Sequence, residues 1–406
     1  MIQVPLSQKY STIVNTLLFL FPISLLGVKS LGDLILALLM LIGIYIAYTD
    51  KINPFKQPEL KLVSWLSVAY YTVIVLSIFL SDKSLELLHY ADRDLAFLFT
   101  PLIALAIYKA DIDFNRLILA IKLSLIMIGG YILYQHLVNG VITDWRLSHG
   151  ITPTLTLMML VFSWINISHE NKYNLLLTAI SSILALSLII LAERRSAFLV
   201  LIILSVLFIF LNSKPTISKN RNNIFAIVLT LICASLLLAQ PNLINRLSMA
   251  VENVKEWTTG DKVTNSTTEI RLEMYKGGLL SIKEKPIFGH GYRNTTDPAS
   301  RFAHNQNLAR TISAYSNLHN TFINALVFGG VIALIATLAL LLLPLKKFWQ
   351  AFKLKENSNI KYASLGILLM SGYIILSATN GMLGGVAENA FLVFFLSIFL
   401  PKVIKK

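Results

Sequence analysis

The stretch "HNTFINALVFGGVIALIATLALLLLP", residues 319–344, decides the fold of this chain. It opens with His319, Asn320 and, one turn later, Asn324, and the rest is almost entirely apolar. About 20 predominantly apolar residues cross the hydrocarbon core of a bilayer as a helix, so the stretch predicts a transmembrane helix. Polar groups that face lipid are costly. The three polar residues therefore predict a wet site at the membrane margin.

Similar apolar runs recur along the whole chain. Of its 406 residues, 55% are hydrophobic and only 14% are charged, which is unlike a soluble domain. We expect an all-α, polytopic integral membrane protein with about twelve transmembrane helices. No cleavable signal peptide is evident, so the first apolar segment is expected to remain as an anchor. The predicted spans are 11–28, 31–48, 61–81, 94–110, 115–138, 151–168, 173–192, 195–212, 222–240, 319–344, 360–379 and 386–402.

The distribution of basic residues predicts the orientation in the membrane. An even number of spans puts both termini on one side, together with the basic segments 213–221, 344–361 and 401–406. The positive-inside rule makes that side cytoplasmic. The net charge of +14 is then mostly topological. A nucleic-acid partner would need basic residues gathered on one folded surface, so we expect none.

The opposite side holds one long polar segment. We divide the chain into transmembrane helices one to nine at 1–240, a large loop on the non-cytoplasmic side at 241–318, and helices ten to twelve at 319–406. Within the loop, apolar residues of 243–257 recur by threes and fours, which is typical of an amphipathic helix. A second helix is predicted to begin at the capping box Ser266-x-x-Glu269 and to end before Pro286. An insertion this long is more often functional than decorative.

Arginines and histidines gather on the loop side of the membrane. A guanidinium group binds phosphate with a planar, permanently charged fork, so several converging arginines favour a phosphate-containing ligand. Each arginine alone is equally well explained as an anchor at the end of a span or as a solvated surface residue. The arginines are Arg146, Arg194, Arg195, Arg271, Arg293 and Arg301, and the histidines are His149, His290, His304 and His319.

His319 is the candidate general base. In the first turn of a helix it would lie beside the positive end of the macrodipole, which keeps the imidazole neutral near pH 7. A neutral imidazole can accept a proton. The alternative is a capping or interfacial histidine, and His149, His290 and His304 are rival bases on the same side.

Other chemistries lack their motifs. The loop side shows no His-x-x-x-His spacing, and the single cysteine, Cys233, lies inside a predicted span. A GxSxG nucleophile elbow and a Walker P-loop are also missing. We therefore expect no metal and no cofactor.

Four segments together resemble the O-antigen ligase/polymerase superfamily. "HNTFINALVFGGV" (319–331) is similar to its His-Asn…Gly signature, and "ERRSAFLV" (193–200) places Arg195 on the arginine of a second motif. "WRLSHGITPTL" (145–155) places Arg146 on another. "TTEIRLEMYKGGLLSIKEKPIFGHGYRN" (267–294) resembles the family's loop segment and ends in its Pro-Ile-x-Gly-x-Gly turn. The fourth segment places Arg271, Gly289 and Gly291.

The sequence departs from the family pattern at two places. Gly330-Val331-Ile332-Ala333 stands where a second glycine, threonine or tyrosine is usual after the histidine. Arg194 replaces a small residue before Arg195. Neither departure touches His319.

The resemblance implies a GT-C-like glycosyltransferase in the inner membrane of a Gram-negative cell. Its donor would be a glycan on undecaprenyl pyrophosphate, its acceptor lipid A–core, and its active site periplasmic, in contact with membrane lipids. The chemistry would be metal-independent and inverting, with His319 as the base. Arg195, Arg271, Arg146 and Arg194 would bind the diphosphate, and Asn320 would orient substrate or ring.

Three alternatives remain. An O-antigen polymerase uses the same donor but lengthens the glycan, and a protein O-glycosylation ligase differs only in its acceptor. A polysaccharide-lipid flippase or transporter is a different class, in which internal repeats and helices broken near the midplane are frequent. We find no convincing repeat between the two halves, and the polar residues lie at one margin.

Overall fold

The computed structural model describes residues 6–28, 30–165, 171–212, 267–354 and 359–404, with a few separate residues between 231 and 255. Its regular elements are all helices. They are α1 (Leu6–Gly27), α2 (Leu31–Thr49), α3 (Pro58–Phe79), α4 (Ser84–Leu87), the 3₁₀ helix η1 (Leu88–Asp94), α5 (Leu95–Lys109), α6 (Phe114–Asn139), α7 (Ile151–Ser163), α8 (Lys172–Leu191), α9 (Arg195–Asn212), α11 (Thr267–Ile282), α12 (Thr296–Ser300), α13 (Gln306–Ser313), α14 (Thr321–Leu354), α15 (Ile360–Ser377) and α16 (Val386–Val403).

Eight of the described helices are long and apolar enough to cross a membrane: α1, α2, α3, α6, α8, α14, α15 and α16. The chain is therefore a multi-pass membrane protein, as its composition predicts. Three further helices, α5, α7 and α9, coincide with predicted spans but do not meet the same criteria of length and hydropathy. The predicted span 222–240 and most of the predicted helix 243–257 lie outside the described residues. The total of twelve spans stays a prediction.

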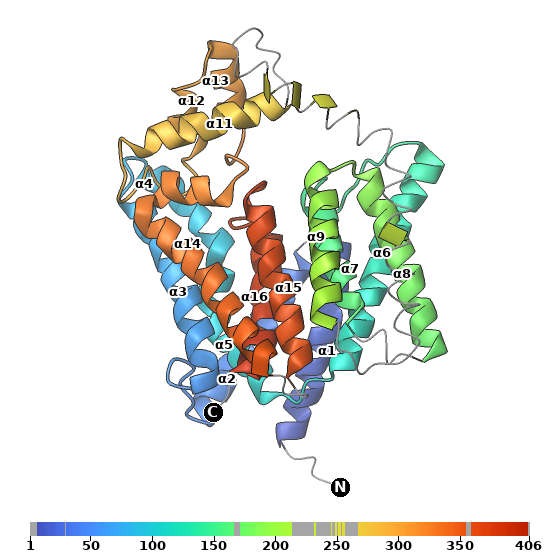
Figure 1. The fold of residues 1–406 in the computed structure, drawn as a ribbon. Coiled ribbons are helices and arrows are strands. Elements are labelled where there is room, and N and C mark those ends of the chain that lie inside the picture. The colour runs from blue at the N-terminus through green and yellow to red at the C-terminus, as the bar shows by residue number, and fades with distance from the viewer. Residues whose placement is uncertain are drawn as a thin grey trace.

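The helices form a bundle around α16 (Figure 1). On one side α2, α3 and α5 pack together, and α14 packs on α3; on the other, α1, α7 and α8 pack against α6. Phe391, Phe395 and Phe399, spaced by four, share one side of α16 and meet Phe162 of α7 at centroid distances of 6.1, 5.2 and 5.9 Å. This aromatic contact joins the two sides through α16.

One end of the bundle carries the short helices α11, α12 and α13, and we call it the loop end (Figure 1). The start of α1 and the end of α16 lie at the opposite end. The loop has a small apolar core of its own, which reaches into the bundle through residues on either side of the start of α14. Its buried members are Ile270, Met274, Ala299, Leu308, Ile312, Leu318 and Val327.

Helix α14 is broken, which the sequence analysis did not expect. Gly329 (φ −138°, ψ 15°) and Gly330 (φ 64°, ψ −156°) leave helical geometry. The predicted single span thus consists of a short helix from Thr321 to Phe328 and a longer one that begins at Val331. Glycine adopts the left-handed region without a Cβ penalty, which explains why the chain breaks here.

Candidate functional site

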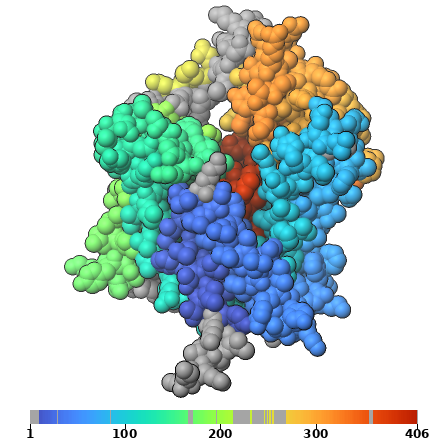
Figure 2. Space-filling model, turned by 180° about the vertical axis from the view of Figure 1, so that it is seen from behind, coloured from blue at the N-terminus to red at the C-terminus, as the bar shows by residue number. Residues whose placement is uncertain are grey.

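A cavity of about 510 Å³ lies at the loop end of the bundle. Its wall is built from segments that are far apart in sequence: Tyr70, Arg93, and residues from 148–154, 292–295, 316–328 and 380–388, together with Arg194. Figure 2, which shows the molecule from behind, shows a hollow below the orange loop segments, with red atoms of the C-terminal part of the chain deep inside it. The cavity brings His319 and Arg194 to one site.

His319 is held by its backbone and its ring. Its φ of 53° is left-handed, which is uncommon for a residue with a Cβ. Its N–H donates to Oδ1 of Asn317 (2.8 Å), and its carbonyl accepts from the hydroxyl of Tyr275 (3.1 Å). The ring meets Tyr315 edge to face at 5.3 Å. The expected position in the first turn is wrong, because α14 begins at Thr321.

Burial and two positive charges keep the His319 imidazole neutral. Burial first, then the charges of Arg271 and Arg194, lower its pKa from 6.5 to about 4. The ring is therefore neutral at pH 7, and its unprotonated nitrogen can accept a proton. The sequence analysis had attributed the same state to a helix dipole.

Arg194 lies on the cavity wall beside His149. Its Nη2 is 3.3 Å from Nδ1 of His149. A guanidinium only donates, so Nδ1 accepts and the His149 proton is on Nε2. Gly150 makes room for this group, because a Cβ there would come within 3.0 Å of Nη2. Burial and the charge of Arg271 lower the pKa of Arg194. Two guanidinium groups that repel each other favour an anion with more than one charge.

Two further predicted arginines, Arg271 and Arg195, differ from Arg194 in position. Arg271, on α11, is half-buried and does not line the cavity, but its charge acts on both His319 and Arg194. Arg195 is the first residue of α9 and directly follows Arg194; the position of its side chain lies outside the description.

The structure does not bring Arg146 to the cavity wall. Its Nη1 pairs with Asp144 at 3.3 Å, and its guanidinium lies 4.1 Å from the centre of the Tyr131 ring. These contacts order the loop that leads to His149. The binding role expected for Arg146 stays a prediction without support from its position.

Asn320 caps α14. Its Oδ1 accepts the N–H groups of Phe322 and Ile323, both at 3.0 Å, and its Nδ2 donates to the carbonyl of Ala378. Asn324, in contrast, lines the cavity and accepts the N–H of Leu318. The two asparagines therefore differ in role: Asn320 caps the helix, and Asn324 lines the cavity.

The break in α14 is closed by the loop turn 286–291. Three backbone hydrogen bonds join them, from His290 to Val327, from Gly291 to Phe328, and from Val331 to Pro286 (2.7, 2.8 and 2.9 Å). They satisfy backbone groups that the break removes from the helix ladder. The approach requires glycine: a Cβ at Gly330 would come 2.2 Å from the Ile287 carbonyl oxygen, and one at Gly289 would come 2.4 Å from the Phe328 backbone.

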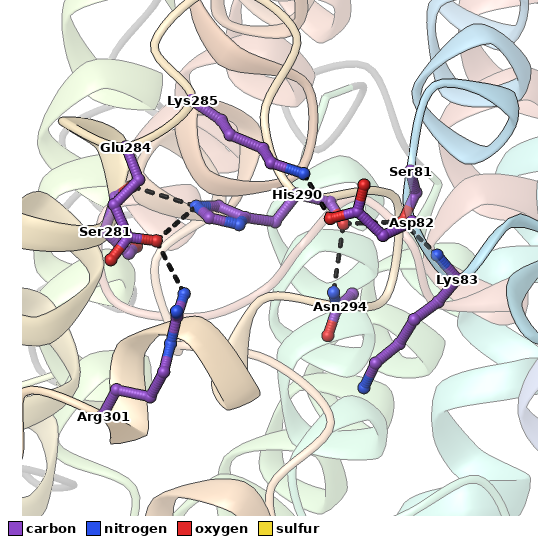
Figure 3. Close-up of polar contacts among 9 residues, drawn as sticks. All are labelled: Ser81, Asp82, Lys83, Ser281, Glu284, Lys285, His290, Asn294 and Arg301. Carbon is purple, nitrogen blue, oxygen red and sulfur yellow. Dashed lines mark hydrogen bonds and ion pairs between the residues drawn. The ribbon is translucent and has the colours of Figure 1, made fainter.

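The same turn is tied to the α3–α4 connection (Figure 3). Ser81 and Asn294 donate to the His290 carbonyl at 2.9 and 3.0 Å, and Lys285 pairs with Asp82 at 2.5 Å. The buried His290 ring contacts the Ser281 carbonyl at 2.9 Å, so it serves the loop and not the cavity.

The remaining rival, His304, is exposed and also lies away from the cavity wall. Arg301 pairs with Glu284 at 2.7 Å on the surface of the loop (Figure 3). Of the rival bases, only His149 shares the cavity with His319.

Two charged residues of the cavity, Arg93 and Glu388, were not predicted from the sequence. Arg93 precedes a predicted span by one residue and resembles any interfacial arginine. Glu388 lies just inside a predicted span, after the glycine-rich segment 381–385, and a carboxylate in that place was an available signal.

In the described part of the chain, no three side chains among His, Cys, Asp and Glu are grouped as a metal site requires. The absence of a metal and a cofactor stays an expectation from the motifs.

Fold and site together define a multi-pass membrane protein with a cationic cavity at the loop end of its helix bundle. Residues 180–338 match the family model described as O-antigen ligase, and this range includes Arg194, Arg195, Arg271 and His319. Through this region, the chain is similar to the O-antigen ligase family. A protein of Haemophilus influenzae (strain ATCC 51907 / DSM 11121 / KW20 / Rd), described as uncharacterized, is 23% identical over 406 residues, which cover 97% of this chain and 99% of its own.

Proposed function

We propose that this chain joins O-antigen polysaccharide from undecaprenyl pyrophosphate to lipid A–core during lipopolysaccharide biosynthesis. The match to this family model supports glycan transfer in a membrane, and the description of the model favours the ligase over the polymerase. The observation that carries the proposal is the pair His319 and Arg194 on one cavity wall, with a neutral imidazole beside permanent positive charge.

The chemistry needs a base and a site for the leaving group. The acceptor hydroxyl oxygen attacks the anomeric carbon, its proton passes to the neutral His319, and the bond from that carbon to the diphosphate oxygen breaks. The bonding electrons leave with undecaprenyl diphosphate, and the configuration of the anomeric carbon is inverted. Arg194 and Arg271, with Arg195 following Arg194 in the chain, stabilise the charge on the departing diphosphate.

The place of the cavity fits lipid-anchored substrates. Donor and acceptor both stay in the bilayer through their acyl or prenyl chains, so their reacting groups meet at the membrane margin. We place the loop end in the periplasm of a Gram-negative cell and both termini in the cytoplasm, in line with the positive-inside rule. A cysteine at position 262, with Cys233→Ser, should then react with a membrane-impermeant maleimide in whole cells. Protection of that cysteine would reverse the orientation.

Reconstitution separates the ligase from its alternatives. Purified protein in liposomes with lipid-linked glycan and lipid A–core should give glycan covalently joined to lipid A–core, visible as a mass shift. A longer glycan that remains on undecaprenyl pyrophosphate would identify a polymerase, and a glycosylated protein acceptor a protein ligase. Movement of the lipid-linked glycan across the bilayer without a new bond would identify a flippase.

A further inference from the structure

A second part of the cavity wall surrounds Glu388 and consists of other residues than the part around His319. We call it the Glu388 end. Arg293 donates from Nη2 to the carbonyl of Gly384, and the N–H of Gly384 donates to Oδ1 of Asn389 at 3.2 Å. Asn389 in turn donates to the buried Asp94 at 2.6 Å. These bonds hold the connection between α15 and α16 against Arg293 and against Asp94 at the end of η1.

Three polar atoms in this wall have no hydrogen-bond partner. They are Oε2 of Glu388, Nε of Arg293 and the hydroxyl oxygen of Tyr292; all three atoms are buried, and all three residues line the cavity. Only 6% of Glu388 is exposed, so its carboxylate is nine-tenths buried. A buried polar group without a partner loses its hydration without compensation, and in native proteins such groups call for an explanation. A ligand in the cavity would supply the missing bonds.

The chemistry of the Glu388 end indicates which part of a ligand would bind there. A carboxylate accepts hydrogen bonds from hydroxyl groups and repels a diphosphate, whereas the adjacent guanidinium of Arg293 repels a cation. A neutral group with several hydroxyls satisfies both. The rings of Tyr70 and Tyr292 also line the cavity and offer apolar faces. This combination fits a sugar ring.

The distance to the proposed base is short enough for one substrate to reach both. Gly381 lies against Asn317, the residue that accepts the N–H of His319, since a Cβ at Gly381 would come 2.9 Å from its Oδ1. Gly384 lies beside Arg293 at the Glu388 end. The three residues from Gly381 to Gly384 span at most ~11 Å.

We propose that Glu388 is a sugar-binding residue, which accepts hydroxyl hydrogen bonds from a sugar adjacent to the reacting bond. The inference rests on the proposed transfer and assigns two parts of one cavity wall: the diphosphate at Arg194 and a sugar at Glu388. The sugar belongs either to the donor glycan or to the acceptor core. The structural alternative is that Glu388, in the first turn of α16, only stabilises the start of that helix.

Binding of three ligands tests the proposal without requiring turnover. Affinities of the full-length protein in nanodiscs are measured for undecaprenyl diphosphate, for the same lipid carrying the glycan, and for lipid A–core. We expect Glu388→Gln to weaken binding of one sugar-bearing ligand by about 10- to 100-fold, as for the loss of a hydrogen bond to a charged group, and undecaprenyl diphosphate by less than about 2-fold. Glu388→Asp, which keeps the carboxylate, should recover part of the loss.

Glu59→Gln is the matched control. Glu59 is likewise buried in the first turn of a membrane-spanning helix, α3, where Gln57 donates to its Oε2 at 2.9 Å, but it does not line the cavity. All three affinities should stay within about 2-fold in this variant.

Each outcome for Glu388→Gln decides a point. Loss confined to the lipid-linked glycan assigns the donor sugar, and loss confined to lipid A–core assigns the acceptor sugar. Unchanged binding of both, or equal loss of all three ligands, would overturn the proposal and leave Glu388 a structural residue. A wild-type protein that binds none of the three would instead refute the proposed function.

Discussion

The neutral state of His319 gives a specific pH dependence. With a pKa of about 4, ~90% of the imidazole is neutral at pH 5, whereas a histidine with the ordinary value of 6.5 would be only ~3% neutral. The general base must be neutral. As far as His319 determines it, kcat/KM should therefore change little between pH 8 and pH 5 and should fall near pH 4. Below that, protonation removes the base.

Substrate should shift this limit. A diphosphate near Arg194 and Arg271 neutralises the charges that help to lower the His319 pKa, so the acid limb of kcat should lie at higher pH than that of kcat/KM. Arg271→Gln removes one of these charges and should raise the His319 pKa in the free protein. Burial, the largest cause, persists in this variant.

The assay is NMR of protein labelled with ¹³C at histidine Cε1, combined with pH–rate profiles. The chain has seven histidines, and His319→Gln identifies the relevant signal by its disappearance. A His319 ring that titrates near 6.5 in the free protein would refute the reasoning, as would an unchanged titration in Arg271→Gln.

Three further predictions concern the surroundings of His319. Gly330→Ala should lower the melting temperature or prevent accumulation, because backbone strain of this kind costs about 1–3 kcal/mol before the clash is added. Its control, Gly130→Ala in α6, adds a Cβ in open space and should not destabilise the protein; equal behaviour of the two would mean that the turn does not need this approach. Arg194→Lys and Arg271→Lys should each slow transfer by about 10-fold or more at matched protein level, since an ammonium lacks the bidentate fork, and full activity in both would reduce them to point charges. Tyr275→Phe removes the bond to the His319 carbonyl and should lower kcat several-fold with the donor KM unchanged; an unaltered kcat would show that this bond does not position the base.

Hydropathy predicts most of the bundle because lipid imposes a strong rule on sequence. A helix in a bilayer satisfies its own backbone and needs about 20 apolar residues, so long spans such as α6 and α15 can be recognised locally. Helices α5 and α7, of 15 and 13 residues, are ambiguous by the same rule. The break in α14 was not predicted because it depends on a contact between distant parts of the chain. Gly329 and Gly330 can be recognised in the sequence, but the turn 286–291, whose backbone bonds to the break, is distant from them in sequence.

The candidate site could be predicted only in part. His319 and Arg194 were found from residue type and side of the membrane, and the cavity brings them together. Arg146 was predicted at the site but does not line the cavity, and Asp144, two residues earlier, offered an ion pair in the sequence itself. Glu388 was missed because the lining of a cavity depends on which loops meet, and neither composition nor spacing reports that.

The most direct test of the account is the rate at which His319→Gln transfers glycan to lipid A–core. Glutamine keeps a similar size and can hydrogen-bond, but it cannot take up the acceptor proton. At matched protein level, with undecaprenyl diphosphate bound as tightly as by the wild type, we predict a rate lower by about 10²- to 10⁴-fold, the usual contribution of a general base. A rate close to that of the wild type would contradict the account, because the proton would then leave by another route.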